Sequence, residues 1–487
     1  MPSLVNATFW SAIQRFGGLA IGFISNIVLA RLLNPEDYGI VGLILVFVGV
    51  ADVLIDGGLG NALIQKKSLT DKDISTVFSS NLLLSIFLFG LLFFSAPSIA
   101  DYVNIERFDL FLRIEAVMII IRALYVVHFS LINRDMDFQL LAKINIISNT
   151  LTTILAILMA ILGMGVWSLI LRNILLDVIL CFSYCYKRPL SFSLRIYKNS
   201  LRQMIGYGFF VALSNVAETL YSSLLSFILG KKFSVKELGY YNQAYSLEQI
   251  PVYSVTSILN QVYFPFLSKE QEDIPKMRVD IQKSIMVMSF FVYPLMIYLI
   301  CFAQPIIVLL YSEKWMPAVP FFQILCTLGF TNYLYHLNRS ILKAIGKSRA
   351  LFSSQIIGCC IGILLIVAAI PLGIFAVVIA VAFNSIIGVI IVAWFTGEYI
   401  GLNLFQQTKM AILNFIFSLA TGLLSYYVFI NFTWNEFILL PISFTFFVMI
   451  YGLLHFMFKS LSFQMVFSIF ENYYKTKFNK NEKTGNN

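Results

Sequence analysis

Long apolar runs separated by short polar breaks follow one another along almost the whole chain. The runs are about 20 residues or longer, which is the length that a helix needs to cross a hydrocarbon core of roughly 30 Å. They lack the alternation of apolar and polar positions that a membrane β-barrel requires. The pattern therefore predicts an all-α integral membrane fold with about fourteen transmembrane helices, near residues 7–30, 38–58, 74–97, 109–132, 140–162, 165–186, 203–229, 238–266, 282–311, 318–343, 350–370, 373–397, 407–430 and 436–458.

The composition agrees with a membrane protein, and the absence of known catalytic and metal-binding motifs argues against an enzyme. Of the 487 residues, 59% are hydrophobic and 12% are charged, whereas an average soluble domain has about 25% charged residues. The six cysteines form no C-x-x-C pair, the three histidines are scattered, and no phosphate-binding P-loop occurs. The sequence therefore predicts no catalytic residues, no metal and no cofactor, and a chain that is not an enzyme.

The distribution of Lys and Arg predicts the orientation in the membrane. With a cytoplasmic N-terminus, the inner loops carry 23 of these residues and the outer loops carry 6. Since basic residues favour the cytoplasmic side, both termini are expected there. The formal net charge of +9 is dispersed over many loops, which argues against nucleic acid as a partner.

Two polar turns occur twice in the chain. "ARLLNPEDYG" (30–39) aligns with "GKKFSVKELG" (230–239) at an offset of 200, and "LINRDMDF" (131–138) aligns with "ILKAIGKS" (341–348) at an offset of 210. Six helices separate the copies, and an even number gives both copies the same orientation. The repeat predicts two parallel six-helix lobes around a central cavity. The expected parts are an N-terminal lobe (1–190), a C-terminal lobe (191–400), two extra helices (401–460) and a polar cytoplasmic tail (461–487).

Four stretches carry a resemblance to a known family. "ARLLNPEDYGIVGL", "LIDGGLGNALIQKK" (54–67), "LINRDMDFQLLAK" (131–143) and the segment 237–273 resemble the Wzx/PST polysaccharide transporter family. This family belongs to the multidrug/oligosaccharidyl-lipid/polysaccharide flippase superfamily, and the sequence is most similar to its colanic and teichuronic acid exporter branch. The resemblance covers the chain to about residue 460.

The resemblance implies a function, a substrate and a location. The expected activity is flipping of undecaprenyl-diphosphate-linked oligosaccharide repeat units across the bacterial inner membrane by alternating access. The expected partners are that lipid-linked oligosaccharide and the membrane lipids, together with polysaccharide polymerase and glycosyltransferases. The family fold is two six-helix lobes with a V-shaped cavity and two extra helices.

Five arginines lie within the predicted spans. Each costs roughly 2.5–3.5 kcal/mol near a helix centre, so we expect them to face a wet cavity, an acidic partner or both. A guanidinium grips phosphate bidentately, which makes these residues candidates for binding the anionic headgroup. Structural ion pairs between helices are the alternative, and Arg113 and Arg339 lie close enough to helix ends to snorkel. The candidates are Arg15, Arg113, Arg122, Arg172 and Arg339.

Carboxylates within the spans are candidates for coupling to H⁺ or Na⁺. The predicted ion-coupling residues are Glu218, Glu248 and Asp52. Tyr241, Tyr245 and Glu248 share a helix face at i, i+4 and i+7, which suits sugar contacts as well as ordinary helix packing.

Two further features concern the helix ends and the pairing of Arg122. Asp56, Gly57 and Gly58 are candidates for a gate or hinge, or for a simple contact at a helix end. Glu115 precedes Arg122 by seven residues, so it can pair with Arg122 only through a long reach or a water molecule.

Two other functions stay open at this point. A multidrug or cation antiporter of the same superfamily predicts a cavity dominated by acids, which the five arginines oppose. A membrane glycosyltransferase or polymerase usually needs a large outer loop, and the longest outer loop here has about a dozen residues.

Overall fold

The computed structural model describes residues 4–56, 59–66, 68–190, 193–206, 209–258, 267, 273–432, 434–468 and 471. Within these ranges every regular element is a helix, which confirms the predicted all-α fold. The chain forms two compact units, unit 1 (Met1–Gln243) and unit 2 (Ala244–Asn487). The predicted boundary between lobes near residue 190 falls inside unit 1, and the division into two six-helix lobes stays a prediction.

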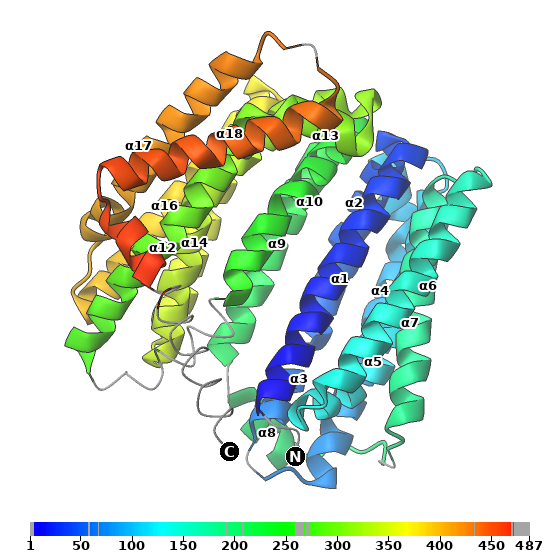
Figure 1. Ribbon diagram of the computed structural model, residues 1–487. Helices are drawn as coiled ribbons and strands as arrows, with labels where there is room; N and C mark the ends of the chain where they lie inside the picture. The colour runs from blue at the N-terminus through cyan, green and yellow to red at the C-terminus, as the bar shows by residue number, and fades with distance from the viewer. Residues whose placement is uncertain are drawn as a thin grey trace, which may run out of the picture. The chain divides into compact units, whose positions relative to one another are not determined.

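Unit 1 is built around α5, which contacts α2, α3, α4, α6 and α7 (Figure 1). In addition, α1 packs along α6, and α2 packs against α9. The helices of this unit are α1 (Leu4–Leu32), α2 (Pro35–Asp56), α3 (Leu59–Gln65), α4 (Asp71–Val103), α5 (Phe108–Arg134), α6 (Phe138–Ile161), α7 (Val166–Lys187), α8 (Lys198–Gly206), α9 (Phe209–Lys232) and the first part of α10 (Val235–Ile258).

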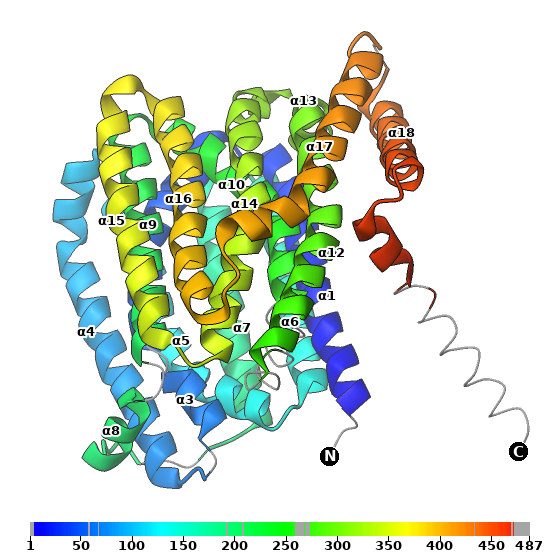
Figure 2. The ribbon, with the colours of Figure 1, turned by 90° about the vertical axis from the view of Figure 1, so that its left-hand side faces the viewer.

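In unit 2, α14 packs against α12 and against α16. In this unit α12 contacts α14 and α17, α16 contacts α14 and α15, and α18 lies beside α17 (Figure 2). The run predicted near 282–311 is divided at Phe302 into two helices, α12 and α13. The helices are α12 (Ile274–Cys301), α13 (Ala303–Tyr311), α14 (Val319–Ala344), α15 (Ser348–Ala369), α16 (Ile374–Ile400), α17 (Leu404–Phe429) and α18 (Glu436–Met457).

The protein is a multi-pass membrane protein. Among the described residues, ten helices are long and apolar enough to cross a bilayer: α1, α2, α4, α6, α7, α12, α15, α16, α17 and α18. The central helix α5 is not among these ten; its 27 residues include Asp109, Arg113, Glu115, Arg122 and Arg134. The predicted number of fourteen spans stays a prediction.

The first pair of repeated turns shares one backbone hydrogen bond. The Leu33 amide donates to the Leu29 carbonyl, and 200 positions later the Phe233 amide donates to the Leu229 carbonyl. An acid lies at the third helical position of both following helices. Asp37 accepts a hydrogen bond from the amide of residue 34, and Glu237 accepts one from the hydroxyl of residue 234. In both turns the acid at the third helical position therefore bonds the residue just before the helix, by a different donor in each copy.

The second pair of turns also matches. α5 ends at Arg134 and α14 ends at Ala344, 210 residues later. Two residues past each end, Met136 and Gly346 both have positive φ, at 58° and 73°, and the next amide in each turn reaches back to a carbonyl of the helix. This is the left-handed cap that commonly ends helices.

The beginnings of α2 and α10 approach each other closely inside unit 1. A Cβ atom added at Gly39 would overlap the carbonyl oxygen of Val235, and one added at Gly239 would overlap that of Pro35. These two contacts are each other's repeat equivalents at the offset of 200. The repeated glycines therefore allow two backbones to touch where any side chain would separate them.

Candidate functional site

A pocket of about 360 Å³ lies in unit 1 between α2, α3, α5, α6 and α7. Its volume falls within the roughly 300–1,000 Å³ that is typical of ligand sites. The walls combine one ion pair, several polar side chains, three aromatic rings and aliphatic groups. The lining residues are Asp52, Ile55, Gly60, Ile64, Arg122, Tyr125, Val126, Phe129, Ser130, Asn133, Asn145, Leu180 and Tyr184.

Arg122 lies between two carboxylates at the charged side of this pocket. Its Nε donates to Oδ2 of Asp177 at 2.8 Å, and its Nη1 pairs with Asp52. The hydroxyl of Tyr125 donates to the other oxygen of Asp177 at 2.9 Å. When all three groups are ionised, this triad from α2, α5 and α7 carries a net charge of minus one.

Helical periodicity brings these side chains to the pocket. Arg122 and Tyr125 are three residues apart on α5 and therefore point to one side. Asp177, Leu180 and Tyr184 lie at i, i+3 and i+7 on α7 and share a face. The side chain of Asp177 is 5% exposed, whereas that of Arg122 is 32% exposed toward the pocket.

The opposite wall is polar and aromatic. Asn145 on α6 donates from Nδ2 to the hydroxyl of Tyr184 at 2.9 Å and to the carbonyl of Leu141 at 2.8 Å. The rings of Tyr125 and Tyr184 have centroids 5.7 Å apart, and that of Phe129 packs edge-on against Tyr184 at 5.9 Å. This wall offers amide and hydroxyl groups next to flat apolar surfaces.

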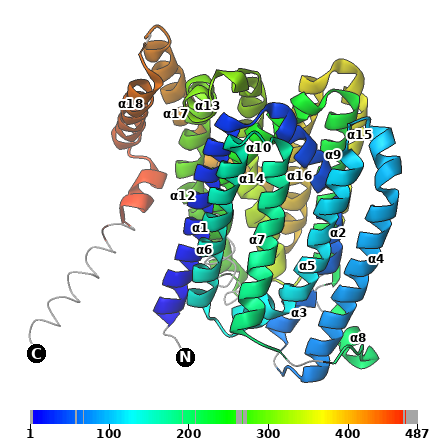
Figure 3. The ribbon, with the colours of Figure 1, turned by 90° about the vertical axis from the view of Figure 1, so that its right-hand side faces the viewer.

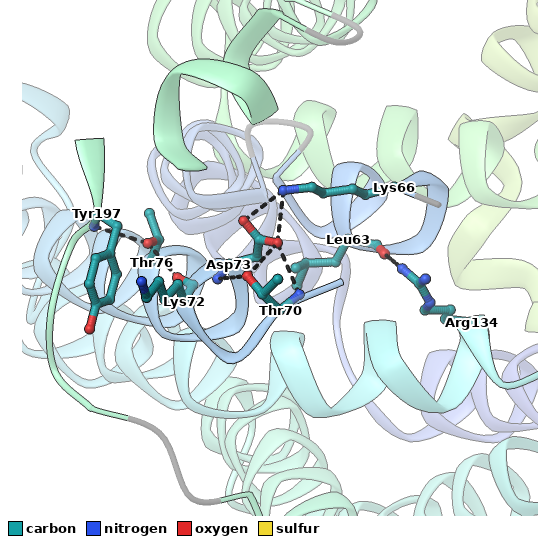
Figure 4. Close-up of polar contacts among 8 residues, drawn as sticks. All are labelled: Leu63, Lys66, Thr70, Lys72, Asp73, Thr76, Arg134 and Tyr197. Carbon is teal, nitrogen blue, oxygen red and sulfur yellow. Dashed lines mark hydrogen bonds and ion pairs between the residues drawn. The ribbon is translucent and has the colours of Figure 1, made fainter. Parts of the chain in front are cut away.

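The short helix α3 closes one side of the pocket and is held at its C-terminal end. Nη1 of Arg134 donates to the carbonyl of Leu63 at 2.6 Å. Lys66, just after α3, pairs with both oxygens of Asp73 at 2.8 Å, and Asp73 also accepts from Thr70 (Figure 4). These contacts tie α3 to α5 and to the first turn of α4.

The segment 193–206, which precedes α9, packs against the first turns of α4. The amides of Ser193 and Tyr197 donate to side-chain hydroxyls on α4, and Lys72 lies over the ring of Tyr197 at 5.7 Å. In Figure 3, α8 and α3 lie beside the first turns of α4, and both contact that helix. The segment from 193 to 206 thereby covers the end of α4 that follows α3.

Two further charged residues of unit 1, the fully buried Glu115 and the half-buried Arg172, do not line the pocket. Oε1 of Glu115 accepts a hydrogen bond from Asn173 at 2.9 Å, while its Oε2 is buried and has no hydrogen-bond partner among the described residues. Nε of Arg172 is likewise buried and has no partner there. Asp177 therefore binds Arg122 directly. Glu115, on the same helix as Arg122, bonds Asn173 instead.

The remaining predicted arginines have different surroundings. Arg113 donates to the carbonyl of Phe93 at 3.2 Å, lies over its ring at 4.9 Å and approaches Asp109 at 3.7 Å. Arg339 belongs to unit 2, is 6% exposed and binds Tyr335 at 2.8 Å and Gln355. Arg15 is half-buried on α1. Their roles in headgroup binding stay predictions.

The predicted sugar and ion-coupling residues are spread over both units. Tyr241 is 4% exposed and Tyr245 is 41% exposed, so the shared helix face of the sequence prediction has two different environments. Glu248 is fully buried; its Oε2 accepts from Gln249 at 2.9 Å, and its Oε1 has no hydrogen-bond partner among the described residues. Glu218 is half-buried on α9.

Three predicted gate residues are not described in full. Helix α2 ends at Asp56, whose side chain lies outside the described part of the chain, as do Gly57 and Gly58. Within the described ranges, no cluster of three or more His, Cys, Asp or Glu residues is placed to hold a metal ion.

Sequence reasoning did not identify Asp177 and Asn145 as site residues. Asp177 is separated from Arg122 by 55 positions, and Asp52 by 70, so no local pattern links them. A weaker signal was present: Asp177 is an acid within an apolar run and shares a helix face with Tyr184.

Comparisons with known proteins agree with this architecture. The model of a family described as "Polysaccharide biosynthesis protein" matches residues 28–320. An uncharacterized membrane protein in the cps region of Klebsiella pneumoniae is 27% identical over 350 residues, covering 70% of this chain and 71% of that protein. The teichuronic acid biosynthesis protein TuaB of Bacillus subtilis (strain 168) is 26% identical over 388 residues, covering 77% and 78%.

A solved structure has the same fold. The lipid II flippase MurJ in an inward closed conformation superposes with a TM-score of 0.70 at 17% identity, covering 92% of this chain and 98% of that chain. At this identity the similarity concerns the fold alone.

Proposed function

Because the chain belongs to the family of polysaccharide biosynthesis proteins, we propose that it is a flippase for undecaprenyl-diphosphate-linked oligosaccharide repeat units. It moves them across the bacterial inner membrane by alternating access. The match of the family model over residues 28–320 carries this proposal. The name of TuaB, which concerns teichuronic acid biosynthesis, and a fold similar to that of a lipid II flippase support it.

In this proposal Arg172 is a headgroup contact, because its Nε is buried and has no hydrogen-bond partner among the described residues. A buried donor without an acceptor is unfavourable, and a phosphate oxygen supplies that acceptor. Arg122 is less suited because two carboxylates already neutralise it. Arg15 and Arg339 are further headgroup contacts in the proposal, and Arg113 lies close to a helix end.

A coupled ion supplies the direction of transport in this proposal. A fully buried carboxylate is costly without a counter-charge, and Oε1 of Glu248 has no hydrogen-bond partner among the described residues. Glu248 therefore needs a proton or a cation, and H⁺ and Na⁺ are the two candidates. Asp52 is a second coupling residue, because its Oδ1 is buried and likewise has no partner in the described ranges. Glu218 is a third.

The proposal includes the remaining properties of such a flippase. The chain acts as a transporter and catalyses no covalent step, it needs no cofactor, and both termini face the cytoplasm. Its substrate comes from glycosyltransferases on the inner leaflet and passes to a polysaccharide polymerase on the outer side.

Depletion of the protein in its own host tests this function. The expected result is accumulation of undecaprenyl-linked repeat units in the inner leaflet, with loss of the surface polysaccharide. Depletion that leaves both the lipid-linked pool and the polysaccharide unchanged contradicts the proposal.

One observation favours a second function, that of a multidrug or cation antiporter. The Asp52–Arg122–Asp177 triad has a net charge of minus one, and a negative pocket attracts cations. Vesicles containing the purified protein distinguish the two functions: uptake of cationic dyes driven by an ion gradient supports the antiporter, and movement of a lipid-linked saccharide supports the flippase.

A further inference from the structure

We propose that the unit 1 pocket receives one sugar ring of the substrate, uncharged or bearing an amino group, and that the diphosphate binds elsewhere. This inference rests on the proposed flippase function, since it divides that substrate between two places. The pocket is the cavity of about 360 Å³ between α2, α3, α5, α6 and α7.

The charge of the pocket excludes the diphosphate. The guanidinium of Arg122 has its Nε on Asp177 at 2.8 Å and its Nη1 on Asp52. While both acids are ionised, the lining Asp52 and the buried Asp177 behind Arg122 leave a net negative charge, which repels phosphate in a medium of low dielectric constant. A neutral polyol experiences no such repulsion, and an amino sugar is attracted.

Polar groups with unused hydrogen-bonding capacity line the pocket. Asp52 Oδ1 is a buried acceptor with no hydrogen-bond partner among the described residues. Asn133 lines the pocket and has no side-chain hydrogen bond to the part of the chain that the structure describes. Sugar hydroxyls both donate and accept, so they match an amide and a carboxylate oxygen at once.

The remaining walls suit the apolar face of a sugar ring. Tyr125, Phe129 and Tyr184 form one aromatic group with centroid separations of 5.7 and 5.9 Å. Aromatic side chains offer a broad apolar surface with a polar end, and Asn145 fixes the hydroxyl of Tyr184 at 2.9 Å. The volume corresponds to about a dozen water molecules at ~30 Å³ each, which is enough for a monosaccharide.

Two probes that differ only in sugar content separate the two parts of the substrate. One is undecaprenyl diphosphate, and the other is the lipid-linked repeat unit extracted from cells depleted of this protein. Dissociation constants are measured with the purified full chain in detergent. Wild-type protein is expected to bind the sugar-bearing lipid at least about tenfold more tightly, which is the worth of one buried hydrogen bond.

Variants of pocket residues then test whether the tighter binding of the sugar-bearing lipid depends on the pocket. Asn133→Leu and Tyr184→Phe are expected to reduce the sugar preference about tenfold while the affinity for undecaprenyl diphosphate stays unchanged. Asn149→Leu is the matched control, since Asn149 lies one turn from Asn145 on α6, bonds its own helix at 2.9 Å and does not line the pocket. Thermal unfolding of each variant verifies that it is folded.

The outcomes separate this inference from the proposed function. If the wild type binds both lipids equally, or if both pocket variants keep the full preference, the sugar pocket is wrong while the flippase proposal stands. If neither lipid binds to folded wild-type protein, the flippase proposal and the pocket fall together.

Discussion

Arg122 lies both in an ion pair between helices and at the wall of a pocket, the two settings that the sequence suggested for a membrane arginine. It is a membrane arginine paired with carboxylates, and its side chain also reaches a polar pocket. Replacing one member of a buried ion pair usually costs more than the pair itself contributes, because the partner charge is left uncompensated. Here two carboxylates depend on one guanidinium.

We predict that Arg122→Ala destabilises the protein by about 3–5 kcal/mol, because Asp52 and Asp177 lose their shared counter-charge. Thermal unfolding and the yield of folded protein in detergent measure the effect. Arg113→Ala is the control on the same helix: it removes a 3.7 Å contact with the partly exposed Asp109, a hydrogen bond to the carbonyl of Phe93 and a contact with its ring. Because these contacts leave no buried charge without its partner, a smaller change of about 1–2 kcal/mol is expected there. Equal stability of the two variants would show that the triad is unimportant for the fold.

Arg172 is expected to behave in the opposite way. Its buried Nε has no hydrogen-bond partner in the described ranges, so Arg172→Ala leaves no described partner group without its bond. We predict normal folding but a loss of export of about tenfold or more, since a charge-assisted hydrogen bond to phosphate is removed.

Arg172→Lys separates charge from geometry at this position. It keeps the positive charge but loses the planar donor fork, so we expect partial export. The measurement is polysaccharide export in a strain that carries only the variant copy, with protein level determined in parallel. Full export by Arg172→Ala at normal protein level removes this residue from the mechanism.

Among the elements, the two glycines at the start of α2 and α10 show what the repeat does. Gly39 and Gly239 occupy equivalent positions, and each lies against the backbone of the opposite turn. The sequence predicted the equivalence of the two turns from their alignment. It did not predict that the turns touch each other, because contact between distant copies has no local signature.

We predict that Gly39→Ala and Gly239→Ala each destabilise unit 1 by about 1–3 kcal/mol, the usual cost of overpacking. The added methyl group meets a carbonyl oxygen that belongs to a backbone and has little freedom to move. Gly49→Ala on α2 is the control, since nothing lies within 4 Å of the added Cβ. Unfolding midpoints measured in one detergent compare the three variants, and a harmless Gly39→Ala would contradict this close approach.

The helices themselves were largely predictable, and their interruptions were less so. Apolar length alone identified α4, α6 and α16 because a long run without breaks has few alternatives to a spanning helix. The break at Phe302 between α12 and α13 lies within a long apolar stretch. Its signal is Gln304 and Pro305, which follow at once and which a prediction from apolar length alone does not use. The short helix α3, which closes the pocket, was missed because its seven residues are too few for a periodic pattern.

At the scale of the whole molecule, the sequence predicted the membrane fold and the class of transporter better than it predicted the residues of the pocket. Membrane insertion and the class of transporter followed from the apolar runs and from the resemblance. The pocket in unit 1 did not, because it depends on side chains from five helices that meet only after folding. Unit 1 extends to Gln243, and it includes α9, which packs against α2. The division into two six-helix lobes near residue 190 stays a prediction.

The charge bias also predicts a topology that can be measured directly. An alkaline phosphatase fused after Asn104, between α4 and α5, is expected to be active because that turn is predicted to face outward. The same enzyme fused after residue 487 is expected to be inactive, since the C-terminus is predicted to be cytoplasmic. The reverse activities, at equal expression of the two fusions, would overturn the orientation.

The central claim is that this chain moves a lipid-linked saccharide from one leaflet to the other. The most direct measurement uses vesicles that contain only the purified protein and the lipid-linked repeat unit, with the fraction of saccharide exposed to an external glycosidase followed over time. The flippase account predicts that all of the saccharide becomes accessible in the presence of a proton or sodium gradient, while about half stays protected in protein-free vesicles. Protection that persists equally in both preparations would contradict it.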